Sequence, residues 1–375
     1  MTKASYRMNV AALWTLAAAL FAPLAGVAPA AEPPAKYAAS DTLNIGPTAS
    51  PQAANLLKTL AWEPAAFTVN VHRGVTAVGT ASPTDADAIV TFDSPRPRDA
   101  APGTPGTSPG AGVNRVMLEW YQARGEGGAL RLNAPAVLVL HILDGSMVLE
   151  RGMARILSKQ GIHAFIMHMP SFGSRRLDHS RLSGPLFFEL CGQSVADARR
   201  ARDAIAALPR VDAERISIQG TSLGGFIAAS TASVDAVFDN TFILLAGGNL
   251  YNMFTNGQRE SRWIRERLEA SGVDDAKLRE LCDTLELTYL ADRLDPARTW
   301  LFSAISDQVV PAANARALAA AAKLEPAHHI WLSGDHYTCV LHLPWVMGQI
   351  AGKLNAAEEA TSHEPQATSG SASSE

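Results

Sequence analysis

The stretch RISIQGTSLGGFIAASTAS, residues 215–233, decides the fold expected for this chain. RISIQG is typical of a strand and LGGFIAASTAS of a helix, and Ser222 lies in the turn between them. Gly220 and Gly224 leave out side chains that would collide in so tight a turn. A strand, a sharp turn and a helix in this order expose a serine hydroxyl in front of a helix N-terminus. The stretch therefore predicts a reactive serine at the edge of a sheet.

A second copy of the same pattern, GTSPG at residues 106–110, lacks this setting. Ser108 is followed by a proline and lies in PRPRDAAPGTPGTSPGAG, whose proline and glycine content excludes regular structure. Since no strand leads to Ser108 and no helix follows it, Ser222 is the predicted nucleophile. The alternative for Ser222, a small residue at a strand-to-helix turn, stays open at this point.

The pattern around the serine motif is that of a sheet covered on both faces. Within residues 134–354 short apolar strands alternate with helical stretches, which predicts an α/β fold with a mostly parallel sheet of about eight strands. The helix expected over 194–208 has Asp197, Arg200 and Asp203 on its solvent face. The expected strands are residues 136–143, 163–169, 215–220, 241–247, 299–305 and 328–334.

The segment before this region has a different pattern. Residues 67–74, 88–94 and 115–124 alternate apolar and polar positions, as half-buried antiparallel strands do. Residues 31–66 are rich in alanine and proline, so a loose segment with one short helix near 53–60 is expected there.

An insertion separates two of the expected parallel strands. It spans about fifty residues, 249–298, and its helical periodicity predicts a helical lid beside the carboxyl edge of the sheet. The α/β domain is expected over residues 67–355. The last residues, 356–375, are polar and low in complexity, and we expect them to be disordered.

The composition fits an ordinary globular protein. Its 375 residues are 47% hydrophobic and 18% charged, and a net charge of -4 without a long basic run argues against nucleic-acid binding. Residues 1–30 join Lys3 and Arg7 to an apolar run and a small-residue ending at Ala30, which predicts a cleaved signal peptide and an exported protein, periplasmic or secreted. Pro23 interrupts the run short of the roughly 20 residues that span a bilayer, so no stable membrane anchor is expected.

The cysteines do not indicate a framework of disulfides. Cys191, Cys282 and Cys339 are too few and too scattered for that or for a zinc site. One bridge at most can form, and three buried thiols are the simpler interpretation.

A reactive serine needs a base, and the base needs a group that orients it. The strand at 299–305 leads into SDQVVP, which puts Asp307 after its carboxyl end, and the strand at 328–334 leads into GDHYT, which puts His336 in the same position. The carboxyl ends of parallel strands meet at one edge, and serine, acid and histidine follow in the chain order of such sites. Ser222, Asp307 and His336 are the predicted triad.

Other acidic and histidine residues fit these roles less well. Asp335 adjoins His336 and would have to point along with it. Asp292 and Asp295 precede their strand and are expected at the opposite edge of the sheet. The remaining histidines nearby begin a strand or lie in a helix: His328, His329 and His342.

The charge that develops on an attacked carbonyl oxygen needs two backbone N–H donors. One is expected from the residue after the nucleophile, Leu223. The other is expected from HILDGSM at 141–147, where Leu143 is the predicted donor and Ile142 the fallback. Ile142 stands where many hydrolases have glycine.

Five motifs in the right order resemble the α/β-hydrolase superfamily: HILDGS, MPSFGSRR, GTSLGG, SDQVVP and GDHYT. MPSFGSRR and the stretch YLADRL are similar to secreted bacterial serine hydrolases related to dienelactone-hydrolase and prolyl-oligopeptidase-type domains. The resemblance implies the α/β-hydrolase fold, with no metal and no organic cofactor.

The expected reaction is hydrolysis of carboxylic esters, with a small-molecule ester or acyl compound as substrate. His336 takes the proton of Ser222, Asp307 orients the imidazole, and water releases the acyl group. An acyltransferase or peptidase on the same fold, and an inert hydrolase-like binding protein, remain alternatives. Four residues are candidates for the substrate pocket, with lid packing as the alternative for each: Phe172, Asn249, Tyr251 and Phe254.

Overall fold

The computed structural model describes most of the chain, namely residues 34–48, 50–74, 84–97, 111–176 and 184–362. The expected signal peptide and Ser108 lie outside these ranges, as does the end of the polar tail. Within the described part of the chain, every helix is too short or too polar to cross a membrane.

One ten-stranded sheet runs through the molecule. Its strands are β1 Ala35–Ser40, β2 Ala66–Arg73, β3 Ala88–Asp93, β4 Arg115–Tyr121, β5 Ala134–Leu140, β6 His163–Met167, β7 Val211–Thr221, β8 Thr241–Leu244, β9 Thr299–Ala304 and β10 His329–Leu332. Their order is β1-β2-β3-β4-β6-β5-β7-β8-β9-β10. Pairing is antiparallel from β1 to β4 and between β4 and β6, and parallel from there to β10. The predicted mixed sheet is confirmed, with ten strands in place of about eight.

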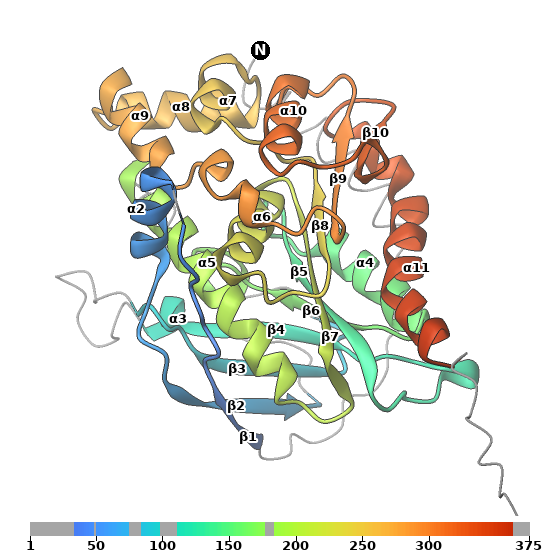
Figure 1. Cartoon of the computed structure of the whole chain (residues 1–375). Helices are drawn as coiled ribbons and strands as arrows, with labels where there is room; N and C mark the ends of the chain where they lie inside the picture. Colours follow the sequence, from blue (N-terminus) through green and yellow to red (C-terminus); the bar gives the residue numbers. More distant parts are fainter. Residues whose placement is uncertain (1–33, 49, 75–83, 98–110, 177–183, 363–375) are drawn as a thin grey trace, which may run out of the picture.

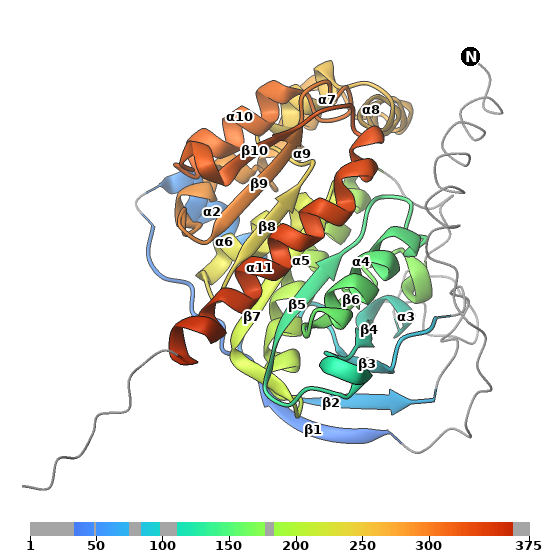
Figure 2. The ribbon, with the colours of Figure 1, turned by 90° about the vertical axis from the view of Figure 1, so that its right-hand side faces the viewer.

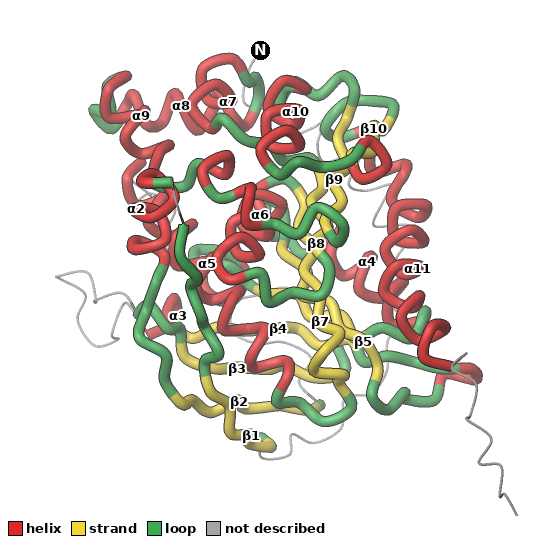
Figure 3. Tube along the Cα trace, in the orientation of Figure 1, coloured by secondary structure: helices red, strands yellow, loops and turns green. Residues whose placement is uncertain are grey.

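Helices cover both faces of the sheet, as Figures 1 and 3 show. They are α2 Pro51–Leu60, α3 Ala111–Asn114, α4 Val148–Lys159, α5 Gly184–Ala206, α6 Leu223–Asp235, α7 Leu250–Asn256, α8 Glu260–Ala270, α9 Asp275–Asp283, α10 Ala312–Ala321 and α11 Leu343–Ser362. α2, α5, α6 and α10 pack on one face, and α4 and α11 on the other, where Figure 2 shows them in front of the sheet.

The central strand β5 shows why these strands are almost wholly apolar. Leu138 and Leu140 belong to the core beneath α5 and α6, whereas Val137 and Val139 belong to the core beneath α4 and α11. All four side chains are fully buried, because both faces of the strand are covered.

The insertion at 249–298 is helical, as its periodicity predicts. Its helices α7, α8 and α9 gather at one end of the molecule, at the top of Figure 1. They share a separate apolar cluster with Phe188 of α5 and with Val309 and Val310, which follow β9.

Among the boundaries that differ from those expected, three differ most. Residues 35–40, in the segment expected to be loose, form β1, whose small side chains give a weak strand signal but which pairs with β2 over its whole length. α5 begins at Gly184 rather than 194, since its first turns also pack on the lid cluster, through Phe188. α11 continues to Ser362, into the tail expected to be disordered.

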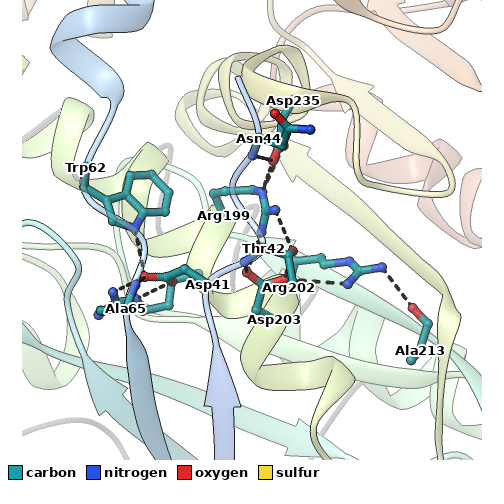
Figure 4. Close-up of polar contacts among 11 residues, drawn as sticks. Asp41, Thr42, Asn44, Trp62, Ala65, Arg199, Arg202, Asp203, Ala213 and Asp235 are labelled. Carbon is teal, nitrogen blue, oxygen red and sulfur yellow. Dashed lines mark hydrogen bonds and ion pairs between the residues drawn. The ribbon is translucent and has the colours of Figure 1, made fainter. Parts of the chain in front are cut away.

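The face of α5 expected to meet solvent is buried. Asp197, Arg200 and Asp203 are 0%, 6% and 4% exposed. For Asp203, Figure 4 shows the reason: the segment around Asp41 and Thr42, which follows β1, lies against this face of the helix, and Arg200 pairs with Asp41 of the same segment. Asp197 is covered differently, because it pairs with Arg175 and accepts from the Ser94 hydroxyl. The charged residues on this face of α5 are therefore buried in ion pairs and are not exposed to solvent.

Arg199 is the centre of these contacts. Its guanidinium contacts Asp203 one turn along α5 at 2.8 Å and Asp235 at the end of α6 at 2.8 Å, and it donates to the Thr42 hydroxyl at 2.9 Å. Asp203 also accepts from the Thr42 backbone N–H at 2.8 Å and from its hydroxyl at 2.7 Å. The arginine thus joins two helices and the N-terminal segment (Figure 4).

A parallel contact fastens the start of the same segment. Arg200 pairs with Asp41, and the Asp41 carboxylate also accepts from the Trp62 indole N–H and the Ala65 backbone N–H, each at 3.1 Å. Two neighbouring arginines of α5 therefore hold two neighbouring residues of the segment.

We expect Arg199→Ala to lower the free energy of unfolding by roughly 3–5 kcal/mol, because Asp235 and Asp203 both lose its guanidinium and Asp203 keeps only the longer contact with Arg202, at 3.6 Å. Urea unfolding followed by circular dichroism measures this loss. Arg262→Ala is the matched control, since Arg262 pairs with Glu266 across the same i,i+4 spacing on an exposed face of α8. Its expected cost is about 0.5 kcal/mol or less, and equal costs for the two variants would contradict the analysis.

Candidate active site

Ser222 lies at the junction of β7 and α6 in a strained backbone conformation. Its φ of 53° and ψ of -116° are unfavourable for a residue with a side chain. Its N–H donates to the Leu244 carbonyl of β8 at 2.8 Å, which helps to hold the turn. Such strain persists only where the surrounding structure imposes it.

The surrounding backbone imposes it through close contacts at two glycines. A Cβ on Gly220 would lie 1.9 Å from the Gly224 carbonyl oxygen, and a Cβ on Gly224 would lie 2.2 Å from the Leu140 carbonyl oxygen. These neighbours are backbone atoms and cannot rotate away. The turn therefore requires glycine at both positions.

The structure brings Ser222, His336 and Asp307 together. His336 Nε2 lies 3.0 Å from Ser222 Oγ, and His336 Nδ1 lies 2.7 Å from Asp307 Oδ2. Because the carboxylate can only accept, Nδ1 carries the proton and Nε2 is free to accept from the serine hydroxyl. The Asp307 side chain is 2% exposed and that of His336 is 10% exposed, so the chain of hydrogen bonds is largely shielded from water.

Two further groups hold the acid and the loop of the histidine in place. Asp307 Oδ1 accepts from the Val309 and Val310 N–H groups at 2.8 and 2.9 Å. Asp335 points away from the imidazole: its carboxylate accepts from the backbone of Tyr337 and Thr338 and closes the turn that carries His336.

The loop expected to provide the oxyanion donor is pinned on both sides of Ile142. The Ile142 N–H donates to Glu150 Oε1 at 3.0 Å, so the fallback donor is already engaged. The Ile142 carbonyl accepts from His141 Nδ1 at 2.7 Å. In a trans peptide the next N–H points opposite to this carbonyl, and Leu143 lines the same cavity as Ser222. Leu143 therefore remains the candidate donor.

The other expected donor, Leu223, is the first residue of α6. An N–H at this position of a helix has no partner within the helix. The positive end of the helix dipole adds to the effect, because it favours negative charge at the same place.

Glu150 and His141 are the contributors that sequence reasoning missed. Burial raises the pKa of Glu150 to about 8, with Asp144 acting in the same direction and hydrogen bonds from backbone N–H groups opposing it. Burial lowers the pKa of His141 to about 3, so its ring is neutral. A glutamate in the first turn of a helix ordinarily indicates a solvated partner of the helix dipole, which is why it gave no signal.

A cavity of about 700 Å³, including its open mouth, adjoins Ser222. Most of its lining side chains are apolar, and they come from α5, α6, α7 and α8. Phe254, one of the candidates for the substrate pocket, lines it together with Met253. Phe172 instead lines a smaller neighbouring cavity of about 310 Å³, including its open mouth, and packs edge-on against the His141 ring with ring centroids 5.0 Å apart.

Two other pocket candidates serve the lid instead. The Asn249 side chain caps α7 by accepting from the Asn252 N–H at 3.3 Å. The Tyr251 hydroxyl donates to Asp275, and Arg279 lies over its ring at 3.6 Å. Neither Asn249 nor Tyr251 lines the cavity beside Ser222, so lid packing, the alternative for both, describes them.

The three cysteines are free and buried. Burial raises the pKa of Cys191 and Cys282 to about 12 and that of Cys339 to about 11, which makes them poor nucleophiles. In the described residues, no group of three histidine, cysteine or acidic side chains could hold a metal ion.

The sheet order, the glycine-flanked serine turn and the histidine between serine and aspartate define the α/β-hydrolase fold, and the chain is a serine hydrolase of this fold. Residues 188–335 match the model of the prolyl oligopeptidase family. The matched range contains Ser222 and Asp307 and ends one residue before His336. A sequence search of curated proteins gave no match.

Solved structures with this fold include both esterases and other hydrolases. Acetyl xylan esterase from a Paenibacillus species is 15% identical, with 94% of this chain and 93% of that chain covered and a TM-score of 0.51. The 2,6-dihydroxy-pseudo-oxynicotine hydrolase is 16% identical, over 65% and 66% of the two chains, with a TM-score of 0.49. Puromycin hydrolase is 16% identical at a TM-score of 0.49, and 77% of this chain matches only 46% of that one. At 15% identity the likeness to the acetyl xylan esterase establishes the fold alone.

We expect Glu150→Ala to lower kcat for an ester by up to about 10², because the Ile142 N–H loses its acceptor and the neighbouring donor loses its orientation. Glu150→Gln keeps an oxygen at the same place and should restore kcat to within a few-fold. Steady-state kinetics on one ester measures both. Equal losses in the alanine and glutamine variants would show that the hydrogen bond to Ile142 is not what matters.

The raised pKa of Glu150 also predicts a pH dependence of stability. The folded protein keeps a proton that the unfolded chain releases at its ordinary pKa of 4.5. This contribution is fully present below pH 4.5 and is lost as the pH rises through about 8. The test measures urea unfolding at about pH 5.5 and about pH 8.5. The free energy of unfolding should decline less between these two pH values for Glu150→Gln than for the parent protein. Identical declines would contradict the assignment.

Proposed function

We propose that the protein hydrolyses carboxylic esters through a covalent acyl-enzyme. The observation that carries the proposal is the position of His336, within hydrogen-bond distance of both Ser222 Oγ and Asp307 Oδ2. A hydroxyl beside a base, and a base beside an orienting carboxylate, form the arrangement that activates serine for attack.

In this mechanism Ser222 Oγ attacks the carbonyl carbon while His336 Nε2 takes the hydroxyl proton. The N–H groups of Leu223 and Leu143 stabilise the negative oxygen that forms. Asp307 stabilises the imidazolium. When the tetrahedral intermediate collapses, His336 gives its proton to the leaving alcohol and Ser222 remains acylated. Water, deprotonated by His336, then attacks the acyl carbon and releases the acid.

The cavity beside Ser222 favours an ester over a peptide. A peptide substrate brings backbone amide groups that need hydrogen-bond partners when they leave water. The cavity has mostly apolar walls, which suit a hydrocarbon group better. The esterase of similar length among the solved structures is consistent with this choice.

A peptidase is the second candidate, and the match to the prolyl oligopeptidase family favours it. Acyl transfer uses the same acyl-enzyme with an alcohol or amine in place of water. The three activities differ in the group that leaves and in the group that accepts the acyl chain.

We expect Ser222→Ala to lower the turnover of p-nitrophenyl esters by on the order of 10⁶, since members of a triad act as a unit. A fluorophosphonate probe should label the parent protein and fail to label the variant. Ser108→Ala is the matched control, because Ser108 stands in the other copy of the glycine-flanked pattern and should be dispensable.

The same assays can also contradict the proposed ester hydrolysis. Unchanged ester turnover in Ser222→Ala would refute the mechanism. An absence of probe labelling in the parent protein would indicate an inert binding protein. A peptide cleaved with a higher kcat/KM than any ester, or an added alcohol acylated in preference to water, would favour the peptidase or the acyltransferase.

A further inference from the structure

The cavity beside Ser222 follows one face of α6. Ser222, Phe226 and Ser230 all line it, at positions i, i+4 and i+8, which share a helix face. At 1.5 Å per residue, the distance from Ser222 to Ser230 along the helix is about 12 Å. The lining of the cavity therefore extends about 12 Å along α6, from the nucleophile to Ser230.

The leaving group and the acyl group of an ester can be assigned to different sides of the serine. His336 has to protonate the leaving oxygen, so the alcohol part lies beside the imidazole. The cavity is lined by Ser222 and by the two residues that carry the candidate oxyanion donors, Leu223 and Leu143, but His336 is not part of its lining. The acyl part is the one that this cavity can receive.

The far walls of the cavity are hydrocarbon. Phe188 of α5, Phe254 of α7 and Ile264 of α8 face α6 across it, and Val309 and Val310 close the side nearest the acid loop. Phe188 and Phe254 contact each other with ring centroids 6.0 Å apart. These walls present rigid apolar surface to whatever lies along α6.

The carboxylate that reaches the cavity is already engaged. Glu260, the first residue of α8, accepts from the Tyr337 hydroxyl, which comes from the loop of the catalytic histidine. This contact ties the lid to that loop. It leaves the apolar walls as the surface that meets the substrate.

We propose that the substrate is an ester of a linear aliphatic acid of roughly eight to ten carbons, since an extended chain advances about 1.2 Å per bond and the cavity runs about 12 Å along α6. The inference rests on the proposed ester hydrolysis at Ser222 and adds the class of acyl group. The carbonyl lies at Ser222, and the methyl end lies beside Ser230.

This binding mode predicts how kcat/KM depends on the length of the acyl chain. Burying one more methylene against the apolar walls should raise kcat/KM about fourfold. The four methylenes between butanoate and octanoate should therefore raise kcat/KM by on the order of 10². The gain ends where the chain reaches the end of the cavity, near decanoate.

The test measures kcat/KM of the full protein for p-nitrophenyl esters from acetate to tetradecanoate, at concentrations where the esters are monomeric. We expect a rise to a maximum at octanoate or decanoate and a fall beyond it. Alkyl phosphonate p-nitrophenyl esters of the same lengths phosphonylate Ser222 Oγ with release of p-nitrophenolate, and the adduct is not turned over. They should inactivate the protein with the same dependence on chain length.

Two variants locate the end of the chain. Ser230→Phe fills the far end of the cavity and should lower the ratio of kcat/KM for decanoate over butanoate at least about tenfold, as expected for several lost methylene contacts. Ile264→Trp narrows the cavity from the opposite wall and should lower the same ratio, which covers the case that Ser230→Phe does not fold. Trp263→Phe, at an exposed neighbour on α8, should leave the ratio unchanged.

The outcomes separate the inference from the proposed function. Ser222-dependent ester hydrolysis that is fastest with acetate or with esters of aromatic acids, or that is independent of chain length, would overturn the aliphatic acyl class and leave the esterase standing. Failure of both esters and phosphonates to react at Ser222 would overturn the proposed function, and the inference with it. A ratio that drops equally in Trp263→Phe would also contradict the proposed binding mode.

Discussion

The close approach of three backbone segments is the constraint on which the site depends. β5, the end of β7 and the start of α6 meet where Gly220 and Gly224 have no room for a Cβ. Because the contacts are backbone against backbone, the geometry cannot relax through side-chain rotation. The positive φ of Ser222 is maintained by this crossing, and the hydroxyl is thereby fixed relative to the carboxyl edge of the sheet. His336, Asp307 and the oxyanion loop are then aligned with a point that does not move.

Hydrogen bonds around the reacting serine extend this rigidity to the loops. Asp307 uses one oxygen for His336 and the other for two backbone N–H groups, so the imidazole is oriented by a carboxylate that is itself held. On the other side of the serine, Glu150 and His141 fix the N–H and the carbonyl of Ile142. Both arrangements place donors and acceptors before any substrate binds, which is the condition for strong electrostatic stabilisation of a transition state.

The parts of the site that the sequence predicts are those set by local order along the chain. The glycine pattern around Ser222, and the loops after two parallel strands that carry Asp307 and His336, follow from strand and turn signals and from the rule that such strands end at one edge. Glu150 could not be found in this way, because its partner is a backbone N–H eight residues away and its burial depends on tertiary packing. Tyr251 and Asn249 were candidates by position alone, and the direction of their side chains is not encoded in spacing.

The buried face of α5 escaped prediction for a related reason. Charged residues at regular spacing along a helix indicate solvent exposure unless other polar segments cover them. Here residues 41–44, more than a hundred residues earlier in the chain, cover Arg200 and Asp203, and Ser94 and Arg175 cover Asp197. One consequence concerns divergence among related sequences. Arg199 contacts acids on two different elements, so replacing any one of Arg199, Asp203 and Asp235 removes a hydrogen-bond partner from a charged group in the interior. Over evolutionary time these three positions should change jointly, through combined replacement by apolar residues, or stay as they are.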